Sequence, residues 1–316
     1  MQLTTQIPIS KSNHLIDYHA KILCLGSCFA QNMGEKFDYY KFQNSCNPFG
    51  IIFNPVSLES IIKRAVNYQK FTADDLFFHN ERWQCFELHS EMCGTEPEDL
   101  LLQLNSVLEQ FHQDLQKATH FIITLGTAWV YRHLASQQIV ANCHKVPQSK
   151  FQKELLSIAQ IQQSLAEITS KVSSLNPNVH FIFTISPVRH LKDGFVQNQQ
   201  SKAHLISALH DFMQTEAVVS SYFPAYEIMM DELRDYRFYA DDLLHPNALA
   251  IKYIWQKFTD SHISSNSYSM MDEVANIRKA LAHKPFQPES ESHQKFLSQL
   301  QLRIEKLQSQ LGQISF

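Results

Sequence analysis

Short apolar runs recur along this chain, and longer stretches with helical spacing of their apolar residues separate them. The runs lie at residues 21–27 (KILCLGS), 120–127, 179–188 and 225–231. Each run is too short for a helix, and its apolar residues are continuous rather than alternating, which is typical of parallel strands buried on both faces. The helical stretches would form the right-handed crossovers between such strands. The pattern therefore predicts an α/β sandwich. The expected helices lie at 28–41, 55–69, 97–116, 155–172 and 201–219.

Two segments do not follow this alternation. Residues 70–95 predict a hairpin, because apolar and polar residues alternate on either side of Asn80-Glu81. Residues 133–152, here called the arm, show little periodicity of either kind. Both segments are expected to overhang the edge of the sheet. We assign them as insertions in one main domain at residues 1–262.

A helical extension is expected at residues 263–316. It contains a serine-rich stretch, a helix at 271–283, a break at two prolines and a last helix at 291–312. Apolar residues three and four apart form a short heptad seam in the last helix. Because fewer than three heptads rarely hold a coiled coil, we expect this seam to pack on the main domain, with a homodimer through it as the alternative. The seam consists of Leu297, Leu300, Ile304, Leu307, Leu311 and Ile314.

Composition excludes several classes of protein. The 316 residues are 44% apolar, so the chain can bury a large core without disulfides. Its net charge is −4 and its Lys and Arg residues are scattered, which argues against a nucleic-acid partner. No signal peptide or long apolar run is present, so we expect a cytoplasmic protein without a membrane span. Six irregularly spaced cysteines without a C-x-x-C pair predict reduced thiols, and we expect neither a metal ion nor a cofactor.

Ser27 closes the first predicted strand, and a helix is expected to begin at the next residue. Gly26 permits a tight turn there, and the unpaired N–H groups of a helix N-terminus can stabilise an oxyanion. Ligands of open α/β sheets bind at the carboxyl edge, where Ser27 would stand. The alternative is that Ser27 is only the N-cap of the helix, which is a very common role for serine.

Asp242 and His245 supply the second part of the expected site. An Asp three residues before a His can accept the Nδ1 proton, which leaves Nε2 to take a proton from a serine. The alternative is a capping Asp beside a solvated loop His. Because the strand ends of this fold meet at one edge, we predict a triad with Ser27 Oγ within hydrogen-bond reach of His245 Nε2.

Cys28 is a competing nucleophile. A thiol beside a helix N-terminus can have a lowered pKa and react as a thiolate. The residue after a nucleophile more often fills the junction between strand and helix as a small apolar group. We therefore expect Ser27, rather than Cys28, to attack the substrate.

Several motifs, in order and over nearly the whole chain, resemble those of the GSCFA-domain family, which is similar to a branch of the SGNH/GDSL hydrolases. The resemblance implies a flavodoxin-like three-layer αβα sandwich with strand order 2-1-3-4-5. It also implies that Ser27 is the nucleophile and that Asp242 and His245 are its partners. The motifs are GSCFA at 26–30, NPFGIIFNP at 47–55, TLGTAWVY at 124–131, ANCHK at 141–145, SPVRH at 186–190 and Asp-x-x-His at 242–245.

One position departs from the superfamily pattern. Those hydrolases usually carry Gly-x-Asn-Asp after the third strand, and its Asn donates to the oxyanion, whereas Thr127 and Ala128 follow the glycine here. As replacement donors we expect the backbone N–H groups of Ser27 and Gly50, with the side-chain amide of Asn142. The Thr127 hydroxyl is a further candidate.

Four residues are candidates for binding the substrate. Arg189 and His190 follow the fourth predicted strand, where Arg189 can clamp a carboxylate or phosphate and His190 can donate a hydrogen bond. The alternative for Arg189 is an ion pair with Asp193. His144 in the arm and Trp129 at a strand end are weaker candidates for lining the pocket.

Together these residues predict a carboxylic ester hydrolase that works through an acyl-serine intermediate. The expected substrate is a small-molecule or carbohydrate ester, such as an O-acetyl group on a sugar. Two alternatives stay open: a catalytically weak binding or scaffold protein on the same fold, and an O-acyltransferase in which a sugar hydroxyl replaces water.

Overall fold

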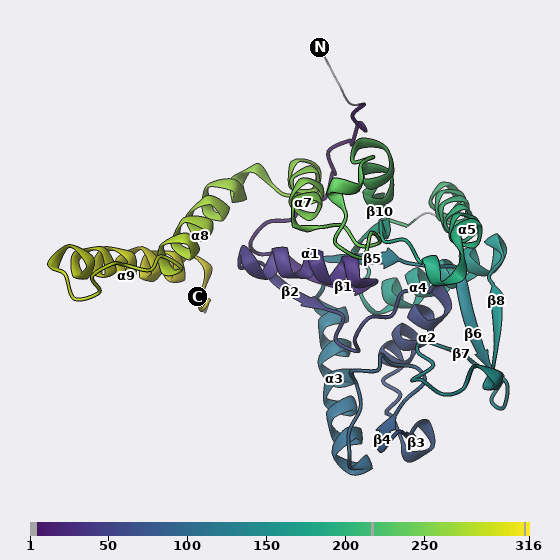
Figure 1. The fold of residues 1–316 in the computed structure, drawn as a ribbon. Coiled ribbons are helices and arrows are strands. Elements are labelled where there is room, and N and C mark those ends of the chain that lie inside the picture. The colour runs from purple at the N-terminus through teal and green to yellow at the C-terminus, as the bar shows by residue number, and fades with distance from the viewer. Residues whose placement is uncertain (1–4, 216–217, 313) are drawn as a thin grey trace.

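Five parallel strands form the central sheet of the computed structural model, which describes residues 5–215, 218–312 and 314–316 (Figure 1). Neighbouring strands pair in the order β10-β9-β5-β1-β2, and every pair is parallel. Numbered along the chain, this order is 2-1-3-4-5, so the predicted fold class is confirmed. The strands are β1 (Lys21–Gly26), β2 (Gln43–Cys46), β5 (His120–Leu125), β9 (His180–Ile185) and β10 (Ser220–Tyr222).

Helices cover both faces of this sheet (Figure 1). Successive side chains of a strand point to opposite faces. Leu23 therefore joins the apolar cluster of α2 to α5, whereas Ile22 joins the cluster of α1 and α7. No helix among the described residues is long and apolar enough to cross a bilayer. The helices are α1 (Cys28–Tyr39), α2 (Pro55–Val66), α3 (Pro97–Lys117), α4 (Ile158–Leu175), α5 (Phe195–Thr215) and α7 (Ala248–His262).

Two strands differ from the sequence prediction. Strand β2 (QNSC) carries no apolar run, because it lies at the edge of the sheet and is only partly buried. The apolar run at 225–231 is not a strand but the helical turns α6 (Ala225–Glu227) and η4 (Ile228–Glu232). A short apolar run does not distinguish a buried helix from a buried strand. The predicted helix at 201–219 includes residues 216–217, which lie outside the described residues.

Short antiparallel strands build the two insertions. In the first, β3 (Phe77–His79) pairs with β4 (Arg82–Gln84) around Asn80 and Glu81, which both have positive φ, as tight hairpin turns require. The arm is more regular than predicted, because a short strand within it and a strand at each of its ends pair into one antiparallel sheet. They form a sheet of β6 (Trp129–His133), β7 (Ile139–Val140) and β8 (Phe151–Leu155).

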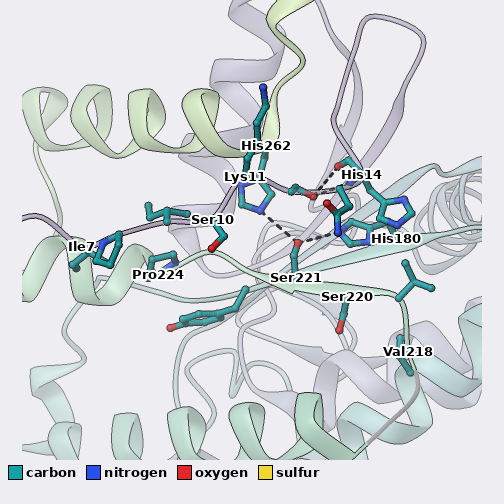
Figure 2. Close-up of a pocket in the computed structure, with 16 residues that line it drawn as sticks. Ile7, Ser10, Lys11, His14, His180, Val218, Ser220, Ser221, Pro224 and His262 are labelled. Carbon is teal, nitrogen blue, oxygen red and sulfur yellow. Dashed lines mark hydrogen bonds between the residues drawn. The ribbon is translucent and has the colours of Figure 1, made fainter.

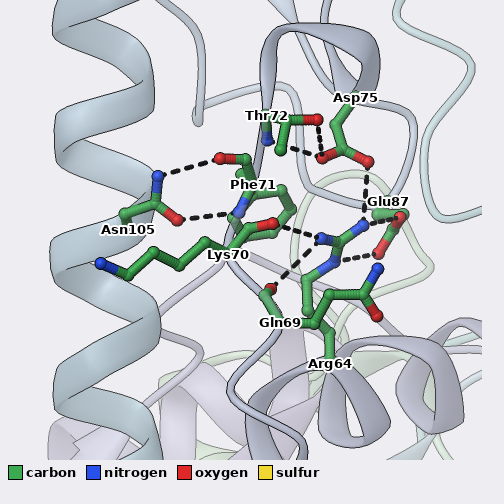
Figure 3. Close-up of polar contacts among 8 residues, drawn as sticks. All are labelled: Arg64, Gln69, Lys70, Phe71, Thr72, Asp75, Glu87 and Asn105. Carbon is green, nitrogen blue, oxygen red and sulfur yellow. Dashed lines mark hydrogen bonds and ion pairs between the residues drawn. The ribbon is translucent and has the colours of Figure 1, made fainter.

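Arg64 of α2 holds the hairpin segment against the main domain (Figure 3). Its Nη2 lies 2.6 Å from Glu87 Oε1 and 2.9 Å from Asp75 Oδ1, and its Nη1 donates to the carbonyls of residues 69 and 70. The guanidinium also lies over the Phe71 ring, 4.3 Å from its centroid. Because Arg64 is buried and both acids are largely covered, these contacts are shielded from water.

The C-terminal extension consists of α8 (Tyr268–Leu281) and α9 (Glu291–Leu311). The heptad seam of α9 packs mainly on α8 instead of on the main domain as expected. Leu300 and Leu307 lie against Val274 and Ile277, while Leu311 also packs against the cluster of α1 and α7. On the surface of the pair, Arg303 forms an ion pair with Glu273 at 2.8 Å.

Replacing Arg64 by Met is expected to lower the free energy of unfolding by about 3 kcal/mol, because it leaves two partly buried carboxylates without their cation. Urea unfolding followed by circular dichroism measures this change. The matched control Arg303→Met breaks the exposed pair and should cost less than about 1 kcal/mol. Equal losses in the two variants would contradict the role assigned to Arg64.

Candidate active site

Four chain segments meet at the carboxyl edge of the sheet. Ser27 follows β1, and its N–H donates to Thr124 O of β5 at 3.2 Å. The loop after β9 joins β5 through Ser186 N–H to Leu125 O at 2.8 Å. The loop at 242–245 is attached in turn, because it accepts backbone and side-chain hydrogen bonds from Arg189. The motifs at 26–30, 124–131, 186–190 and 242–245 are therefore linked at one edge.

Asp242 and His245 form the contact that their spacing predicts. His245 Nδ1 lies 2.6 Å from Asp242 Oδ2, while Asp242 Oδ1 accepts the N–H groups of Leu244 and His245. These backbone bonds, together with the His245 ring, lower the pKa of Asp242 to about 2. The His245 side chain is 43% exposed, and its Nε2 makes no hydrogen bond within the described residues.

Arg189 contacts this loop, and it does not form its predicted ion pair. Its guanidinium donates to Leu243 O and lies over the Tyr239 ring, 4.5 Å from the centroid. Asp193, the predicted ion-pair partner, binds Lys153 instead. Leu243 has a positive φ of 60°, so the loop needs such a contact to hold its turn. Arg189 therefore acts on the position of His245.

Ser27 is the N-cap of α1. Its Oγ accepts the Phe29 N–H at 3.2 Å, and the residue has no exposed surface. The predicted hydrogen bond to His245 Nε2 is absent among the described residues. Cys28 is partly exposed, and burial raises the pKa of its thiol while hydrogen bonding to its own N–H opposes the rise. Of the two residues, Cys28 is thus the more exposed.

The two backbone donors expected for the oxyanion are already in use. Ser27 N–H donates to Thr124 O, as described above, and Gly50 N–H donates to Asn47 O at 2.8 Å. An N–H that completes a turn or a strand pair has no second strong bond to offer. To bind an oxyanion, both N–H groups would have to share or give up these acceptors.

The two side-chain candidates also make contacts with neighbours. Thr127 Oγ1 lies 2.9 Å from Ser201 Oγ and accepts the Trp129 N–H, and it is buried. Asn142 Oδ1 accepts the His144 N–H within the arm at 2.8 Å. Both contacts stabilise local turns, a common use of short polar side chains.

The remaining predicted binding residues make internal contacts. His144 is buried, and its Nε2 lies 2.7 Å from Cys85 O, which joins the arm to the hairpin segment. Trp129 Nε1 donates to Gln197 O at 3.1 Å. The His190 ring stacks on Phe53 at 5.2 Å, and burial lowers its pKa to about 3, so it is neutral. Of these three, only His190 belongs to the loop that follows β9 at the carboxyl edge.

Sequence reasoning missed two polar residues at this edge. Asn47 follows β2, and its Oδ1 accepts the Gly26 N–H at 2.9 Å while its buried Nδ2 has no acceptor among the described residues. Lys202 of α5 is buried, and its Nζ binds two strand-end carbonyls. A signal was present for Lys202, since it occupies the apolar stripe of its helix. That stripe continues with Leu205, Leu209 and Phe212.

A cavity of about 560 Å³ lies at the opposite, amino edge of the sheet (Figure 2). Residues 7–14 border it, together with the starts of β9 and β10 and the end of α7. His14 stacks on His180 at 4.6 Å, His180 Nε2 lies 2.9 Å from Ser221 Oγ, and His262 Nε2 approaches the same hydroxyl at 3.4 Å. Burial lowers the pKa of His180 and of His262 to about 4. No group of three metal-ligating side chains is found in the described part of the chain.

Sequence comparison identifies two matching family models. Residues 21–258 match the model described as GSCFA family, and residues 274–316 match the model described as GSCFA domain protein, C-terminal domain. Among curated proteins, none matches the chain significantly. The first match contains Ser27, Asp242 and His245, and the second covers most of α8 and all of α9.

The buried histidines predict a loss of stability on acidification. His180 and His262 have lower pKa values in the folded chain than the usual 6.5, so the unfolded chain binds protons first. The free energy of unfolding should be highest above about pH 6.5 and fall as the pH drops toward about 4. His262→Phe should reduce this decline by on the order of 2 kcal/mol, whereas the exposed control His19→Gln should not. Urea unfolding at several pH values tests this, and identical slopes in all three proteins would contradict it.

Proposed function

The chain belongs to the GSCFA family, and on that premise we propose that it is a serine hydrolase of the SGNH/GDSL type that cleaves carboxylic esters. The observation that carries the proposal is the contact between Asp242 and the partly exposed His245, at the edge where Ser27 follows β1. A carboxylate on Nδ1 makes Nε2 a proton acceptor, as nucleophilic catalysis by a hydroxyl requires.

In the proposed reaction, Ser27 Oγ attacks the ester carbonyl carbon and its proton passes to His245 Nε2. The oxyanion collapses, the bond to the alcohol breaks, and the alcohol leaves with that proton. Water then attacks the acyl-serine, with His245 again as base, and the acid is released. Since Ser27 has no exposed surface, the substrate must open the β1–α1 turn before the attack.

Two further candidates are favoured by the same burial. Cys28 is more accessible than Ser27, and with the same dyad it would form a thioester in place of the acyl-serine. A binding protein without efficient chemistry would also tolerate a buried Ser27 that has no hydrogen bond to His245.

An O-acyltransferase is a separate alternative. It would form the same acyl-enzyme and then pass the acyl group to a sugar hydroxyl instead of to water. Product analysis with added sugar acceptors would detect the acylated sugar.

Covalent labelling separates these candidates. A fluorophosphonate should label Ser27 of the wild-type chain, as mapped by mass spectrometry, and hydrolysis of p-nitrophenyl acetate should fall at least on the order of 10³-fold in Ser27→Ala. The neighbouring control Cys28→Ala should keep its label and most of its rate. Activity that survives Ser27→Ala but not Cys28→Ala would identify the thiol as nucleophile. No label and no hydrolysis in the wild-type chain would leave the binding protein as the answer.

Asp242→Asn is expected to reduce kcat on the order of 10⁴-fold with little change in KM, because the amide no longer holds the reactive tautomer of His245. Steady-state kinetics with p-nitrophenyl acetate measures this effect. Asp241→Asn is the matched control, since Asp241 is the exposed neighbour on the same loop. A small and equal effect of both substitutions would exclude the dyad from catalysis.

A further inference from the structure

A lysine is buried at the carboxyl edge without a carboxylate partner. Lys202 of α5 is 1% exposed, and its Nζ donates to Gly126 O at 2.8 Å and to Ser186 O at 2.7 Å. The Tyr226 ring centroid lies 5.5 Å away. No ion pair within the described residues includes Lys202, in contrast to Arg64, which has two acids. When it is protonated, this ammonium has no counter-ion beside the strand ends.

Such a charge is costly to bury. Removing an ammonium from water without a counter-ion disfavours its charged form, and burial lowers the pKa of Lys202 to about 7. A methionine has similar length and would fill the same position on the apolar stripe of α5 without this cost. Two neutral carbonyls compensate the ammonium only in part. The position of the charge therefore points to a negative group that is formed at this edge during the reaction.

The Gly126–Thr127 peptide connects Lys202 with the site. The peptide is trans, so its C=O points toward the ammonium and the Thr127 N–H points the opposite way. Thr127 follows β5, the neighbour of β1, and its N–H makes no hydrogen bond within the described residues. A cation on the carbonyl oxygen polarises the peptide and strengthens its N–H as a donor.

We propose that Lys202 is a positioning residue for the oxyanion: its ammonium polarises the Gly126–Thr127 peptide, whose free N–H donates to the negative oxygen formed at the Ser27–Cys28 turn. This inference rests on the proposed hydrolase function. It assigns to a backbone donor the role that an asparagine side chain has in the superfamily that the sequence resembles. The ligand of this donor is the carbonyl oxygen of an ester, which becomes negative only during attack.

The charged and titratable groups around Lys202 decide how kcat should depend on pH. Burial raises the pKa of Cys28 and of Tyr226, and it lowers the pKa of His190 to about 3, so none of the three titrates near pH 7. His245 and Asp242 also lie at this edge, as the proposed base and its partner. The ammonium of Lys202 is present below about pH 7 and lost above it. A fall of kcat as the pH rises through neutrality therefore belongs to Lys202.

Lys202→Met tests the proposal. We expect kcat for p-nitrophenyl acetate to fall on the order of 100-fold while KM changes little, and we expect the alkaline fall of kcat to disappear. A trifluoromethyl ketone, which forms a tetrahedral oxyanion adduct, should bind more weakly by a similar factor. The exposed control Lys192→Met should leave all three readouts unchanged.

The outcomes separate this inference from the proposed function. An active wild-type chain whose kcat stays constant between about pH 6 and 9 overturns the inference alone, and so does a Lys202→Met chain with an unchanged pH profile. If thermal unfolding shows that Lys202→Met does not fold, Lys202→Arg replaces it. Arginine keeps its charge at all these pH values, so kcat of Lys202→Arg should lack the alkaline fall that the wild-type chain shows. A wild-type chain that neither hydrolyses esters nor reacts with fluorophosphonate overturns both proposals.

Discussion

Burial of β1, β5 and β9 on both faces is the constraint on which the rest of this structure depends. Helices from α1 to α7 cover the two faces, so the strand interiors are almost entirely apolar. Polar side chains can then meet only where the strands end. Ser27, Gly126 and Ser186 reach the carboxyl edge for this reason, and the amino edge collects His180 and His262 in the same way.

Two buried cations of this fold differ in their hydrogen-bond partners. Arg64 is surrounded by Glu87 and Asp75, and these contacts join the hairpin segment to α2. Lys202 has only neutral carbonyl oxygens as partners, at the edge where the family motifs meet. A compensated cation contributes to the stability of the fold. An uncompensated cation raises the electrostatic potential of its surroundings, which suits a place where negative charge forms.

The resemblance to a known family predicted the sheet order, and the three-residue spacing predicted the contact between Asp242 and His245. The sequence did not predict which donors stay free. Ser27 N–H donates to Thr124 O, which belongs to a distant part of the chain. Gly50 N–H donates to Asn47 O within a turn that composition does not reveal. Arg189 likewise binds a carbonyl of the 242–245 loop, far from it in sequence.

The sequence by itself determined the α/β class, the place of Ser27 after the first strand and the pairing of Asp242 with His245, since apolar runs and a three-residue spacing act over short distances. Only the tertiary structure decided that Ser27 is covered, that Cys28 is accessible and that Lys202 lies beside the strand ends. Burial and hydrogen-bond partnership depend on which distant segments pack together. Local periodicity does not contain that information, because one sequence pattern is compatible with many neighbours.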